Sequence, residues 1–268
     1  MYPKLFTIGN FTQHTYGLLV AIAFLAGLWA AVGLARREGL DVSRVFNLGV
    51  YAALVAVAGA KLLMVLTDWQ YYWRNPAQML SLQSLLAGGV FYGGFLAAVA
   101  FGFWYTSRAG LPFLKTADAF APVVALGHAI GRLGCFSAGC CWGKPSSLPW
   151  AVTFTDPYAH AMFGVPLGIP LHPTQLYEAL AEALIFAALM FRWKRRSFDG
   201  QILALYLALY GAARFAVEFL RDDPDRAFLF RGLLSTSQLI AMLMLPLGAG
   251  LWYWRRQTAV VPRVRRTA

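Results

Sequence analysis

The sequence has few charged residues for its length. Asp, Glu, Lys and Arg make up 13% of its 268 residues, whereas an ordinary soluble domain carries about 25%. So few charges cannot cover the surface of a water-soluble globule of this size. Apolar residues instead make up 59% of the chain, and they occur in blocks of about 20, the length that a helix needs to cross a hydrocarbon core. The sequence therefore predicts an integral membrane protein.

The chain also lacks the features of a nucleic-acid-binding protein, although its formal net charge is +11. The basic residues stand in short clusters between apolar blocks, with no extended basic face and no aromatic RNA-reading motif. Membrane topology explains such clusters better. We expect no nucleic-acid partner.

The apolar blocks predict an all-α, polytopic membrane fold with seven transmembrane helices. The spans lie at about residues 15 to 35, 46 to 67, 86 to 106, 117 to 134, 174 to 192, 200 to 220 and 235 to 254. Their backbone must be helical, because a strand edge facing lipid would leave polar groups without partners. The chain contains no internal repeat and no low-complexity tract.

The distribution of basic residues predicts the orientation of these spans. Fourteen Lys and Arg residues fall on one side of the membrane and six on the other, and the richer side is cytoplasmic. The N-terminus is then outside and the C-terminus cytoplasmic. We expect residues 1–268 to form a single transmembrane domain, with an outside-facing arm at about 135–172 and a basic cytoplasmic tail at about 255–268.

Charged residues inside the sixth span mark a candidate site. Tyr210, Arg214 and Glu218 follow one another at intervals of four residues, so they share one face of the helix. A charge at mid-bilayer is costly, and such residues usually face protein or water. Arg221 extends the positive region at the outer end of the span. The alternative is a structural ion pair that only locates the helix.

A second arginine lies in the fourth span. Arg132 follows Gly127 and Gly131, and glycines at such spacing let a neighbouring helix approach closely. Two arginines from separate helices suit a phosphodiester, because each guanidinium presents a planar fork of donors to phosphate oxygens. The alternative for Arg132 is that its side chain reaches out to the outer interface.

Two further spans carry weaker signals. The third begins with glycines at 88, 89, 93 and 94 around Tyr92, which indicates close helix packing or an exposed backbone at a ligand. The fifth starts at Pro173 with Gln175 and Glu178 on one face. We expect Glu182, on the same face, to be a half-buried structural carboxylate.

Histidines and cysteines complete the candidates. His14 and Tyr16 enter the first span from outside, and His14 or His128 could act as a base near neutral pH. The alternatives are an interfacial aromatic belt for Tyr16 and an interhelical hydrogen bond for His128.

The chain's three cysteines are Cys135, Cys140 and Cys141. We expect structural roles for them, and a disulfide is possible. We expect no metal site, since C-x4-C-C lacks paired C-x2-C spacing and a clear fourth ligand.

Together these residues resemble the bacterial prolipoprotein diacylglyceryl transferase family over most of the chain. The likeness is strongest in Gly131-Arg132-Leu133-Gly134-Cys135-Phe136 with Gly139 and Trp142-Gly143, in His172-Pro173-Thr174-Gln175-Leu176-Tyr177-Glu178, and in Tyr210-Gly211-Ala212-Ala213-Arg214-Phe215-Ala216-Val217-Glu218-Phe219-Leu220-Arg221. The first stretch is similar to the family signature Gly-Arg-x-Gly-Asn-Phe.

The resemblance implies seven helices in the bacterial inner membrane with an active site opening toward the outer side. It implies transfer of diacylglyceryl from phosphatidylglycerol to the lipobox cysteine of a preprolipoprotein signal peptide, with no cofactor. Arg132 and Arg214 would hold the lipid phosphate, with Tyr16, Glu218 and Arg221 in the same cavity. We expect further substrate contacts from Tyr92, Gly93, Gly94, Gly139, Gln175, Glu178 and Tyr210.

Three positions depart from the family pattern. Cys135 stands where the signature has Asn, Cys140 where Glu is common, and Tyr92 where members carry His before Gly-Gly. The family's thiol-activating base would then be relocated, to His14 or His128. Two other functions stay open from the residues alone: a thiol oxidoreductase that uses the three cysteines, and an anionic-solute transporter that uses Arg132 and Arg214.

Overall fold

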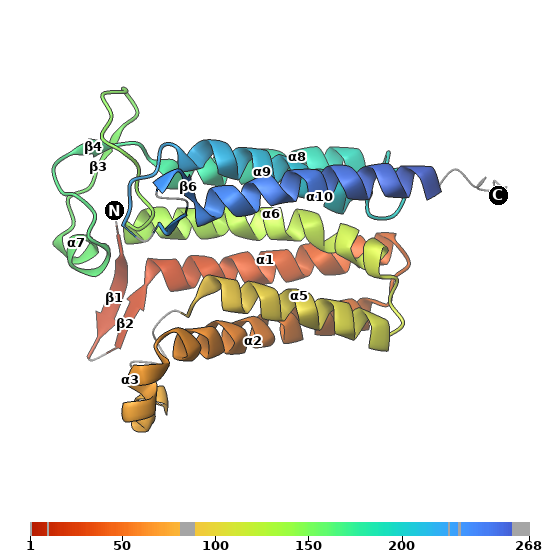
Figure 1. Cartoon of the computed structure of the whole chain (residues 1–268), viewed down its shortest axis with the longest axis horizontal. Helices are drawn as coiled ribbons and strands as arrows, with labels where there is room; N and C mark the ends of the chain where they lie inside the picture. Colours follow the sequence, from red (N-terminus) through yellow and green to blue (C-terminus); the bar gives the residue numbers. More distant parts are fainter. Residues whose placement is uncertain (1, 10, 81–88, 225, 230–231, 259–268) are drawn as a thin grey trace. The chain divides into compact units, whose positions relative to one another are not determined.

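The computed structural model of the protein describes residues 2–9, 11–80, 89–224, 226–229 and 232–258. Most of this chain is helical (Figure 1). Seven of the described helices have 18 or more residues: α1 (Thr15–Arg37), α2 (Val42–Thr67), α5 (Phe91–Arg108), α6 (Phe113–Ala138), α8 (Thr174–Trp193), α9 (Gln201–Glu218) and α10 (Thr236–Thr258). Each coincides with one predicted apolar segment. Residues 86–88 of the third segment and 259–268 of the tail lie outside the described residues.

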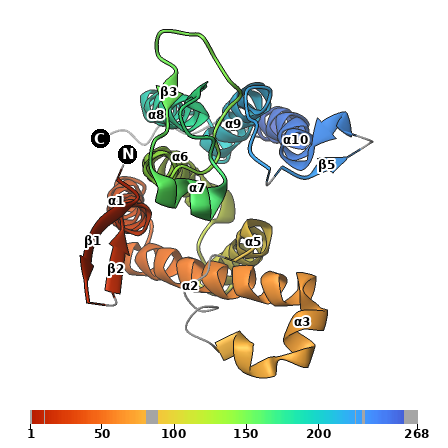
Figure 2. The ribbon, with the colours of Figure 1, turned by 90° about the vertical axis from the view of Figure 1, so that its left-hand side faces the viewer.

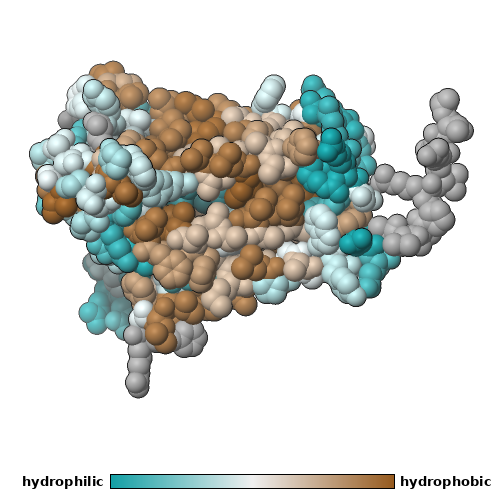
Figure 3. All heavy atoms as spheres, turned by 90° about the horizontal axis from the view of Figure 1, so that it is seen from above, coloured by the Kyte–Doolittle hydropathy of each residue, from teal (hydrophilic) through white to brown (hydrophobic). Residues whose placement is uncertain are grey.

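Within the described residues, α1, α2, α6 and α8 are long and apolar enough to cross a membrane. The prediction of a helical membrane protein is therefore confirmed, while the total of seven spans stays a prediction. These helices carry large apolar side chains on their outer faces, among them Trp29, Leu54 and Leu184. Figure 3 shows one face of the molecule, where apolar side chains cover the middle and hydrophilic ones gather toward the ends. Such a surface suits a hydrocarbon core between polar interfaces.

The chain divides into two compact units. The first comprises residues 1–30 and 117–268, and the second comprises residues 31–116. Helices α1 and α6 each contribute to both units. This division does not test whether residues 1–268 form a single transmembrane domain, which stays a prediction.

In the second unit α2 packs closely against α5, and short α3 (Trp69–Arg74) and η1 (Pro76–Leu80) follow α2. Glycines make the α2–α5 contact possible. A Cβ added to Gly93 would lie 2.4 Å from the carbonyl oxygen of Gly59, and one added to Gly94 would lie 2.7 Å from that of Ala56. Gly93 and Gly94 thus serve close helix packing, one of the two roles predicted for the glycines of this segment.

In the first unit α9 lies between α8 and α10 (Figures 1 and 2). Gly211 of α9 and Gly248 of α10 allow this approach, because a Cβ at either would lie within 3 Å of a carbonyl oxygen of the facing helix. The start of α9 is held by Asp118 of α6, whose carboxylate accepts hydrogen bonds from the backbone N–H groups of Gly200 at 2.8 Å and Leu203 at 2.9 Å. A buried carboxylate satisfies N–H groups that a helix start leaves unpaired.

The arm between α6 and α8 begins later than predicted. Helix α6 continues to Ala138 and ends where Gly139 adopts a left-handed φ of 83°, so the arm starts at 139 rather than at about 135. It contains α7 (Pro157–Phe163) and the antiparallel strands β3 (Val152–Thr153) and β4 (Pro170–Leu171). Its own core holds Trp142, Phe154, Ala159, Val165 and Leu171.

Two more strand pairs complete the first unit. The N-terminal hairpin joins β1 (Lys4–Ile8) to β2 (Phe11–His14), and β5 (Phe228–Leu229) pairs with β6 (Leu234–Ser235) before α10. Both pairs are antiparallel. The hairpin leads directly into α1, so His14 and Tyr16 stand at the point where the chain enters its first apolar helix.

Candidate active site

The carboxylate of Glu178 joins the two arginines that the sequence analysis singled out. Nε of Arg132, on α6, lies 2.5 Å from Oε2 of Glu178, on α8. Nη1 of Arg214, on α9, lies 2.6 Å from Oε1 of the same carboxylate. The three side chains are at most 12% exposed. Two guanidinium groups from separate helices therefore converge on one anionic group inside the first unit.

Beyond this centre the ion pairs continue along α9. Nη2 of Arg214 lies 2.8 Å from Oε2 of Glu218 and donates to Oγ of Ser237 at 2.9 Å. Oε1 of Glu218 accepts from Nε of Arg226 at 3.0 Å. The predicted Arg214–Glu218 face thus exists, and it continues onto the segment that follows α9.

Arg221, which follows the end of α9, is held by a two-bonded ion pair. Its Nε and Nη2 donate to the two carboxylate oxygens of Asp223, at 2.8 and 2.7 Å. Burial alone would lower the pKa of Arg221, but the hydrogen-bonded Asp223 and other nearby negative groups raise it. Arg221 therefore stays positively charged at any physiological pH.

The network is balanced in formal charge. It contains four arginines and four carboxylates, of which Glu182 contacts His128 and the other three pair with arginines: Arg132, Arg214, Arg221, Arg226, Glu178, Glu182, Glu218 and Asp223. A buried ion pair is tolerated only when its members are mutually compensated. An anion that enters between Arg132 and Arg214 must therefore take over the ion pairs that Glu178 makes.

His128 is part of the same network. Its Nε2 accepts a hydrogen bond from Nε of Arg132 at 3.0 Å, since a guanidinium can only donate. Its Nδ1 lies 2.9 Å from Oε1 of Glu182 on α8. His128 thus lies between Arg132 of its own helix and Glu182 of α8, and its predicted interhelical hydrogen bond stays a prediction.

Glu182 differs from its predicted state. We expected a half-buried carboxylate, but its side chain is only 3% exposed and binds His128. The face of α8 that carries Glu178 points into the bundle, and Glu182 lies one turn further along that face. Ionisable groups of both helices then meet away from lipid.

Aromatic rings border the network. The ring of Tyr210 lies 5.6 Å from that of His128 and stacks on Tyr206 at the same distance. A small pocket between α8 and α9 is lined by Glu178, Ala181, Glu182, Tyr210, Ala213, Arg214 and Val217. Tyr210 therefore lies beside Arg214, as its position on the same helical face predicted.

Tyr16 and His14 occupy different surroundings. The ring of Tyr16 packs over Gly134, where an added Cβ would lie 3.1 Å from its Cδ2. Nε2 of His14 instead forms a 2.8 Å hydrogen bond with the hydroxyl of Tyr158 in α7. The structure thus packs Tyr16 against α6 at Gly134, two residues after Arg132 in the sequence, and ties His14 to the arm.

The end of α6 and the start of α8 are joined by backbone-directed hydrogen bonds. Nε2 of Gln175 donates to the carbonyl of Cys140, and Oγ1 of Thr174 donates to that of Cys141, both at 2.7 Å. Gly143 lies where a side chain would clash, since an added Cβ would be 2.6 Å from the carbonyl oxygen of His172 and 2.7 Å from that of Leu220. Thr174, Gln175 and Gly143 therefore shape the loop that follows α6.

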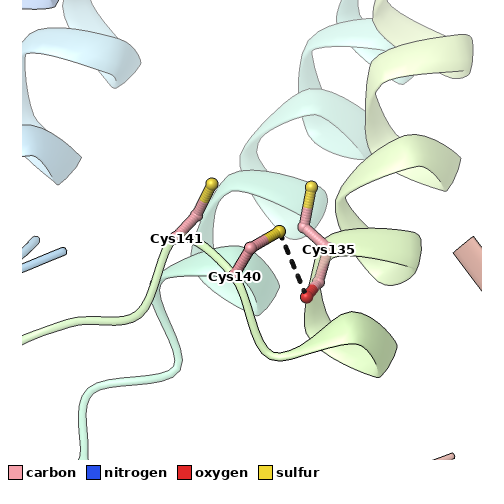
Figure 4. A group of neighbouring side chains, drawn as sticks. All are labelled: Cys135, Cys140 and Cys141. Atoms are coloured by element: carbon pink, nitrogen blue, oxygen red, sulfur yellow. Dashed lines mark hydrogen bonds between the residues drawn. The ribbon is translucent and has the colours of Figure 1, made fainter. Parts of the chain in front are cut away.

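The three cysteines lie together in this loop (Figure 4). Their sulfur atoms are all within 4.8 Å of one another, and none forms a disulfide among the described residues. Hydrogen bonding with the Cys135 and Cys140 thiols lowers the pKa of Cys141, and the positive charges of Arg132 and Arg221 lower it further.

The remaining predicted residues lie in the second unit. Gly93 and Gly94 face α2, and the side chain of Tyr92 is partly exposed. Their predicted role in substrate binding stays a prediction.

Three members of the network were not predicted from the sequence: Asp223, Arg226 and Ser237. All three follow α9 in the chain, and Asp223 and Arg226 lie outside any helical periodicity. Only the short interval between Arg221 and Asp223 hinted at an ion pair.

The fold and the site together define a helical membrane protein with a buried, arginine-rich centre suited to an anion. Residues 3–254 match the family described as prolipoprotein diacylglyceryl transferase. The chain therefore belongs to the prolipoprotein diacylglyceryl transferase family, and the resemblance inferred from the sequence is confirmed.

Curated relatives agree over almost their whole length. A phosphatidylglycerol–prolipoprotein diacylglyceryl transferase of Finegoldia magna is 36% identical over 244 residues, which cover 91% of each chain. One from Clostridium tetani is 33% identical over 92% of this chain and 95% of the relative. One from Vibrio parahaemolyticus is 34% identical over 94% and 90%. These relatives do not favour a thiol oxidoreductase or a transporter.

Proposed function

We propose that this chain transfers the diacylglyceryl group of phosphatidylglycerol to the thiol of a preprolipoprotein's lipobox cysteine. The products are a thioether-linked lipoprotein precursor and glycerol phosphate. The names of the relatives support this activity. The structural observation that carries the proposal is that Arg132 and Arg214, from two helices, both bind the carboxylate of Glu178.

A phosphodiester suits the place that this carboxylate holds. Both groups present two equivalent oxygens to donors, and a guanidinium binds either of them through a planar fork. When phosphatidylglycerol binds, its phosphate takes over the donors of Arg132 and Arg214, and Glu178 moves aside. The site stays positively charged around the phosphate because guanidinium groups do not lose their protons.

The reaction is a displacement at carbon. The sulfur attacks the glycerol carbon that bears the phosphate, the C–O bond breaks, and its electron pair moves onto the phosphate oxygen. Negative charge accumulates on the leaving phosphate, where Arg132 and Arg214 stabilise it. Such electrostatic stabilisation is usually the largest catalytic contribution in a water-poor site. Arg221 and Glu218 hold the outer part of the same network.

The thiol must also lose its proton, and His14 and His128 are the candidate bases. His128 lies within the arginine centre. When Arg132 turns toward a bound phosphate, Nε2 of His128 loses its donor and becomes able to accept a proton. His14 lies at the start of α1, against the arm.

The proposed setting is the bacterial inner membrane, with seven spans in one transmembrane domain. The N-terminus faces outward, the C-terminus is cytoplasmic, and the site opens toward the outer side. The excess of basic residues on one side of the predicted spans supports this orientation.

The activity is tested by incubating the purified protein with phosphatidylglycerol and a lipobox peptide, with mass spectrometry of the peptide as the readout. We expect a diacylglyceryl adduct on the cysteine peptide and none on a Cys→Ser peptide. Arg132→Ala lowers the rate by on the order of 100-fold or more. Arg37→Ala, the same change at an exposed residue, is the matched control. Full activity of purified Arg132→Ala would contradict the proposed site.

A further inference from the structure

The three cysteines are brought together by an unusual turn. Cys135 lies in the last turn of α6, and the backbone N–H groups of Gly139 and Cys140 both bond to its carbonyl oxygen, at 2.9 and 3.2 Å. Gly139 and Cys141 then adopt left-handed φ values of 83° and 61°. The chain therefore folds back, and the thiols of Cys140 and Cys141 approach that of Cys135 (Figure 4).

Cys141 is the one non-glycine residue with positive φ among the residues that the structure describes. A side chain in this region is strained, and such positions are found where a ligand or reacting group is held. Thr174 and Gln175 of α8 hold the loop in this shape through the carbonyls of Cys141 and Cys140. The convergence of the thiols is thus fixed from a second helix.

The spacing of the sulfurs fits a metal ion better than a disulfide. Three thiolates at about 2.3 Å from a tetrahedral Zn²⁺ have sulfurs about 3.8 Å apart. The observed upper limit of 4.8 Å closes to this value with small rotations of the side chains. A disulfide joins only two of the three sulfurs and would leave the third thiol without a partner.

We propose that Cys135, Cys140 and Cys141 bind a soft divalent metal ion, with Zn²⁺ as the probe, and that its open fourth position takes the thiol of the lipobox cysteine. Soft thiolate ligands select such ions. Three protein ligands with one open position are the arrangement of catalytic rather than structural zinc. Among the described residues, no fourth Cys, His, Asp or Glu joins the group.

This inference rests on the proposed transferase function and explains how the thiol would be activated. A thiol that coordinates the ion is deprotonated, and its proton passes to the candidate base, His14 or His128. The bound sulfur then attacks the glycerol carbon, and the electron pair of the breaking C–O bond passes to the phosphate held by Arg132 and Arg214. Cys135 lies three residues after Arg132 on α6, so ion and phosphate lie near each other. No oxidant or reductant is needed.

Metal binding is tested directly on the full-length protein in detergent. The reduced protein is loaded with Zn²⁺, desalted and analysed for bound metal. We expect about one equivalent per chain, and none in the Cys135→Ser/Cys140→Ser/Cys141→Ser variant. His160→Gln is the control, because this arm histidine bonds to the carbonyl of Val165 instead of the thiols. Failure of the reduced wild type to retain Zn²⁺, or equal retention by the triple variant, would overturn the site.

A cobalt spectrum provides a readout that needs no variant and no activity. Co²⁺ at this site should show sulfur-to-cobalt charge transfer and the visible bands of tetrahedral cobalt. Adding the lipobox peptide should strengthen the charge-transfer band, because a fourth sulfur joins the ion, whereas the Cys→Ser peptide should not. A charge-transfer band that does not change when the cysteine peptide is added would exclude substrate binding at the ion.

Activity separates this inference from the function on which it depends. We expect Zn²⁺ to raise the transfer rate at least tenfold over the chelator-treated protein. Equal rates with and without the ion would overturn the metal proposal and leave the transferase intact. A protein that binds Zn²⁺ but transfers no lipid under any condition would contradict the transferase function itself.

Discussion

Nε of Arg132 lies 2.5 Å from Oε2 of Glu178, across the interface between α6 and α8. The same carboxylate binds Arg214 through its other oxygen. The two arginines therefore share an anion that the protein itself supplies. A substrate phosphate must displace this carboxylate from the two arginines. Competition between phosphate and carboxylate can therefore be tested.

Replacement of Glu178 by Gln removes the internal anion and keeps the size of the side chain. Two buried guanidinium groups then lose their shared partner, so we expect the free energy of unfolding to fall by about 3 kcal/mol. Phosphatidylglycerol supplies the missing negative charge. Thermal unfolding should therefore show a larger rise in midpoint on adding this lipid for Glu178→Gln than for wild type.

The control for this experiment is Asp68→Asn, the same loss of charge at an exposed residue of the second unit. Its unfolding midpoint should respond to phosphatidylglycerol as the wild type does. A lipid effect on Glu178→Gln no larger than on wild type would show that phosphate and carboxylate do not compete for the arginines.

His128 offers a second test, because it can act by positioning Arg132 or as a base. Its Nε2 accepts from Nε of Arg132, and the amide oxygen of a Gln can replace that acceptor. If positioning dominates, His128→Gln should retain much more activity than His128→Phe, which leaves Arg132 without this partner. Equal loss in both variants, measured as transfer rate across pH, would instead assign the proton transfer to His128.

Gly143 provides a steric prediction. A Cβ there would lie less than 3 Å from the carbonyl oxygens of His172 and Leu220, so Gly143→Ala must separate the arm from the segment before Arg221. We expect loss of transfer activity and a lower unfolding midpoint. Gly102→Ala in α5 is the matched control: nothing lies within 4 Å of its added Cβ, and alanine favours a helix by about 1 kcal/mol. Equal effects of the two changes would refute the steric explanation.

Replacing Asp118 should lower the stability of the protein without changing the transfer reaction. Asp118→Ala leaves the N–H groups of Gly200 and Leu203 without their acceptor, which should cost about 1–3 kcal/mol for each buried group. Asp118→Asn keeps one acceptor oxygen and should lose about half as much. Since Asp118 lies about 21 Å from Arg132 along α6, the folded fraction of either variant should transfer lipid at close to the wild-type rate.

The sequence predicted the helices well because their signal is local. Blocks of apolar residues set the length of each helix, and all seven coincide with described helices. Helix ends were less accurate. Apolar character fades at Arg132, yet α6 continues to Ala138, because a helix ends where its backbone conformation changes, here at Gly139.

The site was predicted only in part because its contacts join distant segments. Arg132, Arg214 and Glu178 were expected, since charges inside an apolar span need partners. That Glu178 joins both arginines depends on how three helices rotate against one another, which one sequence does not encode locally. The convergence of the cysteines depends on a left-handed Cys141, a conformation for which cysteine has no preference.

The most direct test of the account is a structure of this protein with phosphatidylglycerol bound. The account predicts that the lipid phosphate accepts hydrogen bonds from both Nε of Arg132 and Nη1 of Arg214, at about 2.7–2.9 Å, with Glu178 displaced from at least one of them. A phosphate bound elsewhere, while Glu178 still joins the two arginines, would contradict it.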